Sequence, residues 1–208
     1  MSLFFDFSTR QLDLLKEIGN IGAGNAATAL SNMLNKKIYM KVPDVKIGSF
    51  NEIIDIVGSE EEVIAIYFRL EGDISGSMFF VLSVKQAERY LKELLGSMSV
   101  FNKYEITEIE TSALQELGNI LMGSYVAALA DLTKLLIHPS VPSLSFDMFG
   151  AIISHGFIEL SQNSDRALII DTVIKDDEQP EDDFLSGHIF FMPNVDVYKK
   201  IFEKLEVS

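Results

Sequence analysis

The chain has 208 residues, of which 48% are hydrophobic and 23% charged, so it can bury a substantial core as one domain or as two small ones that share a core. It contains no cysteine, which excludes disulfides and thiolate metal sites, and its formal net charge of −14 argues against nucleic acid and anionic membranes as partners. No apolar run approaches the roughly 18 residues needed to cross a bilayer, and the first residues lack a signal-peptide pattern. We therefore predict a soluble cytoplasmic protein.

The predicted elements form two similar series along the chain. A long helix is predicted over residues 9–34 and another over residues 105–135, where apolar residues recur at spacings of three and four. Runs of β-branched and aromatic residues, bounded by Gly, Pro, Asn and Asp, predict strands after each helix. The predicted strands are Ile38–Val45, Val63–Leu70, Ser77–Ser83, Ala167–Val173 and His188–Met192, and amphipathic stretches follow at Lys85–Leu95 and Asp196–Leu205.

The chain is internally duplicated. Residues 12–45 align with residues 111–144 without a gap, at a constant offset of 99, and eleven of the 34 aligned pairs are identical. Later, residues 75–80 parallel residues 186–191 at an offset of 111, and the acidic segment 176–183 lies where the extra twelve residues must fall. The identical pairs are Leu15/Leu114, Glu17/Glu116, Gly19/Gly118, Asn20/Asn119, Ile21/Ile120, Gly24/Gly123, Ala29/Ala128, Leu30/Leu129, Ile38/Ile137, Val42/Val141 and Pro43/Pro142.

These patterns predict an α/β protein of the α+β type with internal pseudo-two-fold symmetry. We expect a single domain over residues 1–208, made of two repeats at about 8–100 and 105–208. The predicted strands follow one another without intervening helices, so the sheet should be largely antiparallel and flanked by the two long helices. Each half alone would be a thin layer, so we expect the halves to share one sheet or core.

Each long helix is predicted to carry a stripe of three polar residues. Positions i, i+4 and i+7 lie within about 60° of one another on a helix, so the stripe should face outward while the apolar side docks on the sheet. A mid-helix Asn costs about 0.5 kcal/mol relative to Ala, and the Gly beside it about 1 kcal/mol, so retention of both in both halves favours a function over a local structural role. The stripes are Asp13, Glu17 and Asn20, then Ser112, Glu116 and Asn119; the apolar sides are Leu14, Leu15, Ile18 and Ile21, then Leu114, Leu117, Ile120 and Leu121.

Three other patterns are weaker candidates for a site. The segment 176–183, DDEQPEDD, is interpreted as a solvated loop, because it lacks the Gly and the terminal Glu of an EF-hand calcium loop. Residues 19–24, GNIGAG, lie inside a predicted helix rather than between a strand and a helix, which argues against a nucleotide-binding loop. The three histidines, at positions 138, 155 and 188, do not have the spacing of metal ligands, so we assign them structural or surface roles.

The polar stripes are part of a longer motif. Asn20 is followed by 22 residues and then Pro43, and Asn119 by 22 residues and then Pro142. This pattern, Asp/Ser-x3-Glu-x2-Asn-x22-Pro, resembles the signature of the CheC/CheX/FliY family of chemotaxis response-regulator phosphatases. Two complete copies without an appended domain resemble the CheC-like members, since CheX-like members carry one copy and FliY-like members an additional C-terminal domain. The resemblance covers essentially the whole chain.

The resemblance implies a substrate and a catalytic group. The substrate would be the aspartyl phosphate of a CheY-like receiver domain, which brings its own divalent metal and its own active-site Lys, so no cofactor is expected on this chain. The catalytic group would be the carboxamide of Asn20 and of Asn119. A carboxamide can accept a hydrogen bond from the hydrolytic water and donate another to a phosphoryl oxygen.

Docking roles are implied for the other stripe residues. Glu17 and Glu116 would pair with the receiver's Lys, which orients the docked helix and frees the phosphoryl group from that contact. Asp13 and Ser112, one turn further away, would make docking contacts only.

The resemblance also implies a second partner, the receptor deamidase CheD. It would bind away from the phosphatase helices, around residues 147–151, where Asp147 and Phe149 are the candidate contacts; the alternative interpretation is simply a strand end and turn. For the whole chain, the alternative function is a non-catalytic flagellar-switch or adaptor module of the same superfamily. The intact Glu and Asn in both halves argue against that alternative.

Overall fold

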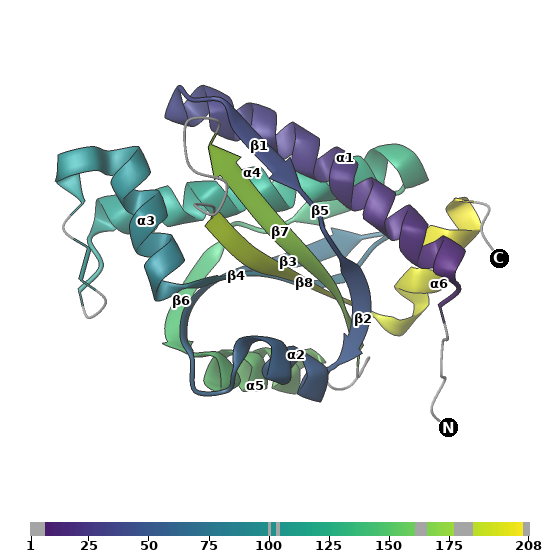
Figure 1. Cartoon of the computed structure of the whole chain (residues 1–208). Coiled ribbons are helices and arrows are strands. Elements are labelled where there is room, and N and C mark those ends of the chain that lie inside the picture. The colour runs from purple at the N-terminus through teal and green to yellow at the C-terminus, as the bar shows by residue number, and fades with distance from the viewer. Residues whose placement is uncertain (1–6, 100, 103–104, 161–165, 177–184, 206–208) are drawn as a thin grey trace.

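The computed structural model describes the chain apart from residues 1–6, 100, 103–104, 161–165, 177–184 and 206–208 (Figure 1). Both halves have the same order of elements, in which a long helix precedes two short strands, a short helix, two long strands and a final helix. The first half comprises α1 (Thr9–Leu34), β1 (Ile38–Lys41), β2 (Val45–Ser49), α2 (Phe50–Val57), β3 (Glu62–Gly72), β4 (Gly76–Ser83), α3 (Val84–Leu95) and a 3₁₀ turn (Gly96–Met98). The second comprises α4 (Glu108–Thr133), β5 (Ile137–Pro139), β6 (Ser143–Met148), α5 (Phe149–Leu160), β7 (Arg166–Asp176), β8 (Leu185–Pro193) and α6 (Val195–Lys204).

The two long helices have equivalent boundaries. Each contains 26 residues and begins with a capping box, in which a Ser or Thr oxygen accepts a bond from the third helical N–H and a Gln or Glu side chain accepts one from the cap's own N–H. Each is followed by a residue in the left-handed region, with φ of 51° at Asn35 and 57° at Lys134. The second helix is shorter than the predicted 105–135, because Thr107 caps it at its start and Lys134 ends it.

One curled sheet joins the two halves (Figure 1). Its strand order is β1-β7-β8-β4-β3-β5, β2 also pairs with β7, and β6 also pairs with β3. The short strands are exchanged, since β1 and β2 pair with a strand of the second half while β5 and β6 pair with a strand of the first. All of these pairings are antiparallel, which confirms the predicted largely antiparallel sheet.

The sheet lies between two layers of helices. On one face α1 and α4 pack on the strands and on each other, with α3 and α6 beside them, and enclose the main core. The two long helices are in close contact at Gly22, where a Cβ would lie 2.9 Å from the Cα of Tyr125. On the other face, inside the curl of the sheet, α2 and α5 cover a smaller core (Figure 1).

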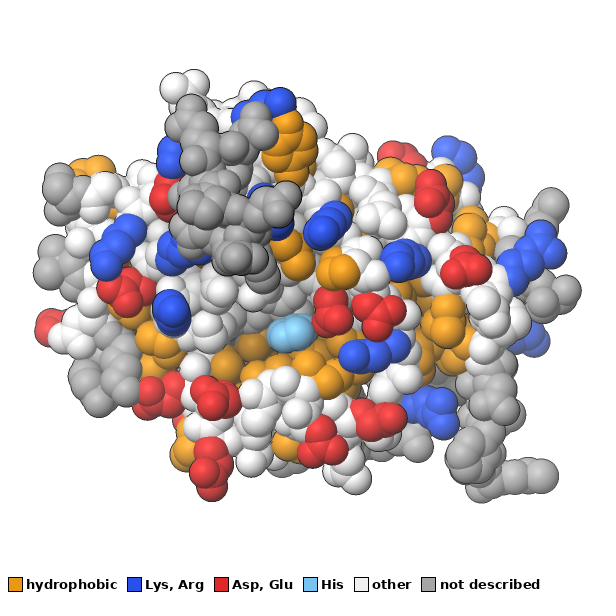
Figure 2. Space-filling view, viewed as in Figure 1, with side chains coloured by type: hydrophobic (Ala, Val, Ile, Leu, Met, Phe, Trp, Pro, Cys, Tyr) orange, Lys and Arg blue, Asp and Glu red, His pale blue; other side chains and the backbone are white. Residues whose placement is uncertain are grey.

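The short helix α2 begins with a capping box of its own. The side chain of Ser49 caps the backbone N–H of Glu52, and the Glu52 carboxylate accepts a bond from the Ser49 N–H at 2.7 Å. That backbone hydrogen bond holds the pKa of Glu52 below its usual range. Figure 2 shows acidic side chains along the lower edge of this face, in the region of α2 and α5. The long helices lie in the upper part of the same view (Figure 1).

Several predicted elements need correction. The two short helices α2 and α5 were not predicted at all, and β5 and β6 were missed. The strand predicted over Ile38–Val45 is interrupted, because β1 ends at Lys41 and β2 begins only at Val45. The segment 147–151 contains the end of β6, which confirms the strand end of the alternative interpretation, but the first turn of α5 follows directly in place of a turn.

The acidic segment 176–183 lies outside the described residues, apart from Asp176, which ends β7. Its interpretation as a solvated loop stays a prediction. Among the residues that the structure does describe, no helix has both the length and the apolar character that a membrane span requires.

Candidate functional site

The two polar stripes lie on the outer surfaces of the long helices. In α1 and in α4 all three stripe side chains are exposed, and the helical spacing brings each trio onto one face. The first trio lies on α1 and the second on α4, so the structure keeps them as two separate sites. These residues are Asp13, Glu17 and Asn20, and Ser112, Glu116 and Asn119.

The apolar side of each helix is mostly buried, as predicted. Leucines and isoleucines of α1 and α4 enter the main core, and two positions next to the stripes are only partly buried. The prediction is wrong for Ile21, whose side chain is 38% exposed beside Asn20. The buried residues are Leu15, Ile18, Leu114, Leu117 and Leu121, and the partly buried ones are Leu14 and Ile120.

The spacing between the motif's Asn and Pro has a geometric cause. From Asn20 to the end of α1 at Leu34 is 34 − 20 = 14 residues, which is about 21 Å of helix. From Lys36 to Pro43 is 43 − 36 = 7 residues, which is about 23 Å of extended chain. The chain therefore runs up the helix and returns along β1 to the level of the Asn. The same lengths recur in the second half.

At the point of return, each edge of the sheet contains a one-residue bulge. Residues 42–44 oppose residues 171–172 of β7, so three residues face two between the β1 and β2 pairings. Residues 140–142 oppose residues 68–69 of β3 in the same way. Each bulge contains the motif proline, which has no N–H to contribute to a ladder. The prolines therefore interrupt the edge strands beside the two stripes.

Hydrogen bonds from the helices hold both bulges. Lys16 Nζ donates to the carbonyl oxygen of Pro43 at 2.7 Å, and its repeat equivalent Gln115 donates through Nε2 to the carbonyl of Pro142 at 3.4 Å. Sequence reasoning missed this pair, because Lys and Gln are not identical in the duplication. Their shared property, a long donor side chain four residues before the Asn, is the signal that could have identified them.

The two asparagines differ in their bonding. Asn20 Oδ1 accepts a hydrogen bond from the backbone N–H of Val42 at 3.3 Å, so the bulge fixes the orientation of its carboxamide. Asn119 Nδ2 instead donates to Glu116 Oε2, one turn earlier on its own helix, at 3.4 Å. The bulges differ too, since Val42 is 3% exposed whereas Val141 is 85% exposed. The sites are equivalent in sequence and distinct in structure.

The charge of Glu116 affects the pKa of a buried tyrosine, Tyr90. Burial raises the pKa of Tyr90, and the nearby Glu116 carboxylate raises it further. The Tyr90 hydroxyl donates to the carbonyl oxygen of Ala113, at 3.4 Å, on the same helix as the second stripe. Burial and the carboxylate both favour the neutral form of this phenol behind the second stripe.

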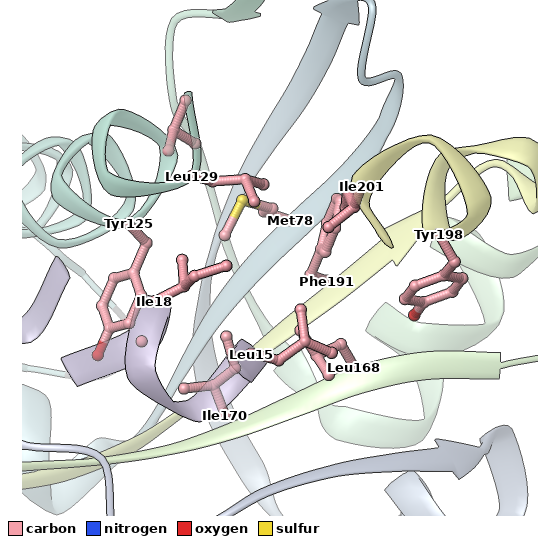
Figure 3. Close-up of a pocket in the computed structure, with 12 residues that line it drawn as sticks. Leu15, Ile18, Met78, Tyr125, Leu129, Leu168, Ile170, Phe191, Tyr198 and Ile201 are labelled. Atoms are coloured by element: carbon pink, nitrogen blue, oxygen red, sulfur yellow. The ribbon is translucent and has the colours of Figure 1, made fainter. Parts of the chain in front are cut away.

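Behind α1 lies a small apolar cavity of about 40 Å³ between the long helices, α6 and the sheet. Figure 3 shows Leu15 and Ile18 of α1 directed toward Met78 and Phe191 of the sheet. Its titratable lining groups are tyrosines, and burial raises the pKa of Tyr125 to about 12. A space of this size and polarity does not suit a phosphorylated substrate. The candidate site is the exposed outer face of the helices.

The remaining predicted residues lie elsewhere. Asp147 is exposed at the end of β6, whereas Phe149 is 0% exposed and packs against Phe190 in the smaller core, so its side chain does not belong to a docking surface. His188 Nδ1 lies 2.9 Å from Asp171 Oδ1 on the neighbouring strand. His138 is exposed on β5, and the side chain at position 155 lies outside the described residues. Within the described ranges, His, Cys, Asp and Glu side chains form no group of three or more that could hold a metal ion.

Comparison with known proteins gives consistent matches. The model of the CheC-like family matches residues 11–47 and 109–146, which contain both stripes and both motif prolines. The CheY-P phosphatase CheC of Bacillus subtilis (strain 168) is 46% identical over 211 residues, covering 100% of both chains. Among solved structures, Thermotoga maritima FliY matches with a TM-score of 0.77 and 22% identity, covering 97% of this chain and 98% of that chain. The FliM middle domain from H. pylori matches with a TM-score of 0.66 and 14% identity, covering 95% and 99%. These structural likenesses show a common fold.

Proposed function

Because this chain belongs to the CheC-like family, we propose that it is a phosphatase that hydrolyses the aspartyl phosphate of a CheY-like chemotaxis response regulator. The observation that carries the proposal is the doubled, exposed Glu/Asn stripe held beside a proline bulge. The full-length relative that is 46% identical bears the name of a CheY-P phosphatase, which supports the same activity.

The proposed chemistry needs little more than the placement of a water molecule. An acyl phosphate is already reactive, so the barrier falls when a water is held in line with phosphorus. Asn20 Oδ1 has two lone pairs, of which one is taken by the Val42 N–H, so the other can accept a hydrogen bond from the water. Its two amide N–H groups remain to donate to phosphoryl oxygens. Asn119 keeps both lone pairs and one N–H for the same purpose.

The glutamates serve docking. Glu17 lies three residues before Asn20, about 4.5 Å along the helix axis, and Glu116 stands in the same relation to Asn119. In our proposal each carboxylate pairs with the receiver's active-site Lys and so withdraws that Lys from the phosphoryl group. The divalent metal belongs to the receiver and arrives with the substrate.

A rival function is a non-catalytic adaptor role, which the fold likeness to the FliM middle domain favours. Decay of a radiolabelled phospho-receiver separates the two. A phosphatase accelerates decay in proportion to its concentration until the receiver is limiting. Unchanged decay at saturating protein, with complex formation verified by co-sedimentation, would establish the adaptor instead.

The resemblance also implies binding of the receptor deamidase CheD, which we place at the exposed end of β6. Asp147 Oδ1 accepts a bond from the Met148 N–H at 2.7 Å, and the Met148 side chain is itself exposed. An Asp147→Lys variant should bind CheD more weakly while its phosphatase activity is retained, because this surface is separate from both stripes. Parental CheD affinity in that variant would place the surface elsewhere.

A further inference from the structure

The five glycines in the long helices fall into two groups. At Gly22 and Gly118 a Cβ would come within 3.0 Å of Tyr125 or Ile66, so close packing inside the protein explains these glycines, and at Gly19 it would make ordinary contact with Val42 at 3.4 Å. At Gly24 and Gly123 a Cβ would have no atom within 4 Å among the residues that the structure describes, and neither glycine has a positive φ. Packing and backbone conformation therefore leave these two glycines unexplained.

Gly in the middle of a helix destabilises it relative to Ala, because the backbone loses more freedom on folding. Gly24 and Gly123 nevertheless occupy equivalent positions in both halves, whereas Gly22 has Leu121 as its equivalent. Ala at either bare position would stabilise the helix and would meet no atom of the described residues within 4 Å. Contacts among the described residues therefore give no reason for the missing side chain, and a docked partner on this exposed face would give one.

The two bare positions lie on the candidate stripes. Glu17, Asn20 and Gly24 stand at i, i+3 and i+7, and so do Glu116, Asn119 and Gly123, so each set faces one way. Each Gly follows its Asn by one turn, about 6 Å along the helix axis. A partner that docks on the Glu and the Asn would therefore also cover the Gly.

We infer that Gly24 and Gly123 are positioning residues, at which the docked phospho-receiver touches bare helix backbone and so brings the adjacent carboxamide within reach of the phosphoryl group. This inference rests on the proposed function. Asn is a short side chain, so its carboxamide reaches a recessed phosphoryl group only if the helix itself comes close. A methyl group at the Gly would hold the receiver's atoms about 3.5–4.0 Å from itself and displace the helix outward. A displacement of about 1 Å at a positioned group can cost about 10²-fold in rate.

The test is the double variant Gly24→Ala/Gly123→Ala, measured for both stability and turnover. We expect the unfolding midpoint to rise by about 2–4 °C per substitution, while kcat/KM for the phospho-receiver falls at least tenfold, with a higher KM and a lower kcat. A purely structural role would change stability alone. The matched control is Asn25→Ala, an exposed position about 100° round the helix, which should also gain stability and keep parental turnover.

Two results would overturn the inference alone. One is parental kcat/KM in a stabilised double variant, with the parent itself active. The other is a loss of stability, which would mean that the protein's own packing requires the glycines. An inactive parent would instead refute the proposed function, and this inference with it.

Discussion

Phe79 and Phe190, which are equivalent residues of the two halves at the offset of 111, pair directly with each other across the β4–β8 ladder. The pseudo-two-fold axis therefore passes between them, at the centre of the sheet. The bulge of Pro43 lies at the β1–β2 edge and that of Pro142 at the β5–β6 edge, which are opposite ends of the strand order. The two candidate sites consequently lie beside opposite edges of the sheet.

This separation predicts that one chain binds two receivers at once. The variant Asn20→Ala/Asn119→Ala retains both glutamates, so it should hold phospho-receivers without rapid turnover. Native mass spectrometry should then show two receivers per chain, and adding Glu17→Ala should reduce the number to one. Saturation at one receiver per chain before that change would contradict two independent sites.

The bond between Lys16 and Pro43 should matter for catalysis at the first site. In an Asn119→Ala background, where the first site alone is active, Lys16→Met removes the donor and keeps the stem. The bulge that anchors Asn20 through Val42 is then less fixed, so kcat/KM should fall a few-fold to about tenfold. Lys16→Arg retains a donor and serves as the control. Equal kcat/KM for the Met variant and its background would show that the bulge needs no such bond.

The contact between Gly22 and Tyr125 should be critical for stability. Gly22→Ala puts a Cβ 2.9 Å from the Tyr125 Cα, so the long helices must move apart, at a cost of about 1–3 kcal/mol. Urea denaturation should show a lower free energy of unfolding. Gly24→Ala, two residues away, should instead gain about 1 kcal/mol. If both substitutions stabilise the chain, the helices are not as close as described.

Three buried tyrosines predict a loss of stability at alkaline pH. Burial raises the pKa of Tyr90, Tyr125 and Tyr198 above the ordinary value of 10, to about 12 for Tyr125. Their neutral form is favoured in the folded state, so this contribution is fully present below about pH 10 and is lost as the pH rises toward the folded-state values. Denaturant midpoints should fall above about pH 10, and less so in Tyr198→Phe. Midpoints that stay level up to pH 11 would refute this.

Local signals explain which elements the sequence predicts. The long helices have capping boxes and sustained periodicity, so their existence follows from the sequence to within a few residues. The helix α2 is only eight residues long, too short for a sustained helical period, although Ser49 and Glu52 form a capping box that could have marked it. Phe149 is predicted as a surface contact only because the family resemblance implies a CheD surface around residues 147–151. Only the tertiary structure shows that Phe149 begins a helix and points into the core.

The candidate site is likewise only partly visible in the sequence. Duplication and helical spacing identify the six stripe residues, because both are properties of a single helix. The bulge that brings Val42 to Asn20 depends on pairing between strands of different halves, which no local pattern encodes. The contrast between the buried Val42 and the exposed Val141 is invisible in the duplication, where the two are identical.

The most direct test of the account is phospho-receiver decay with the asparagine variants. Asn20→Ala and Asn119→Ala should each retain partial activity, because the other site lies at the opposite edge and shares no partner with it. The double variant should lose about 10²-fold or more in turnover, remain folded and still bind the receiver through Glu17 and Glu116. A folded double variant with parental turnover would contradict the account, because the carboxamides would then be structural.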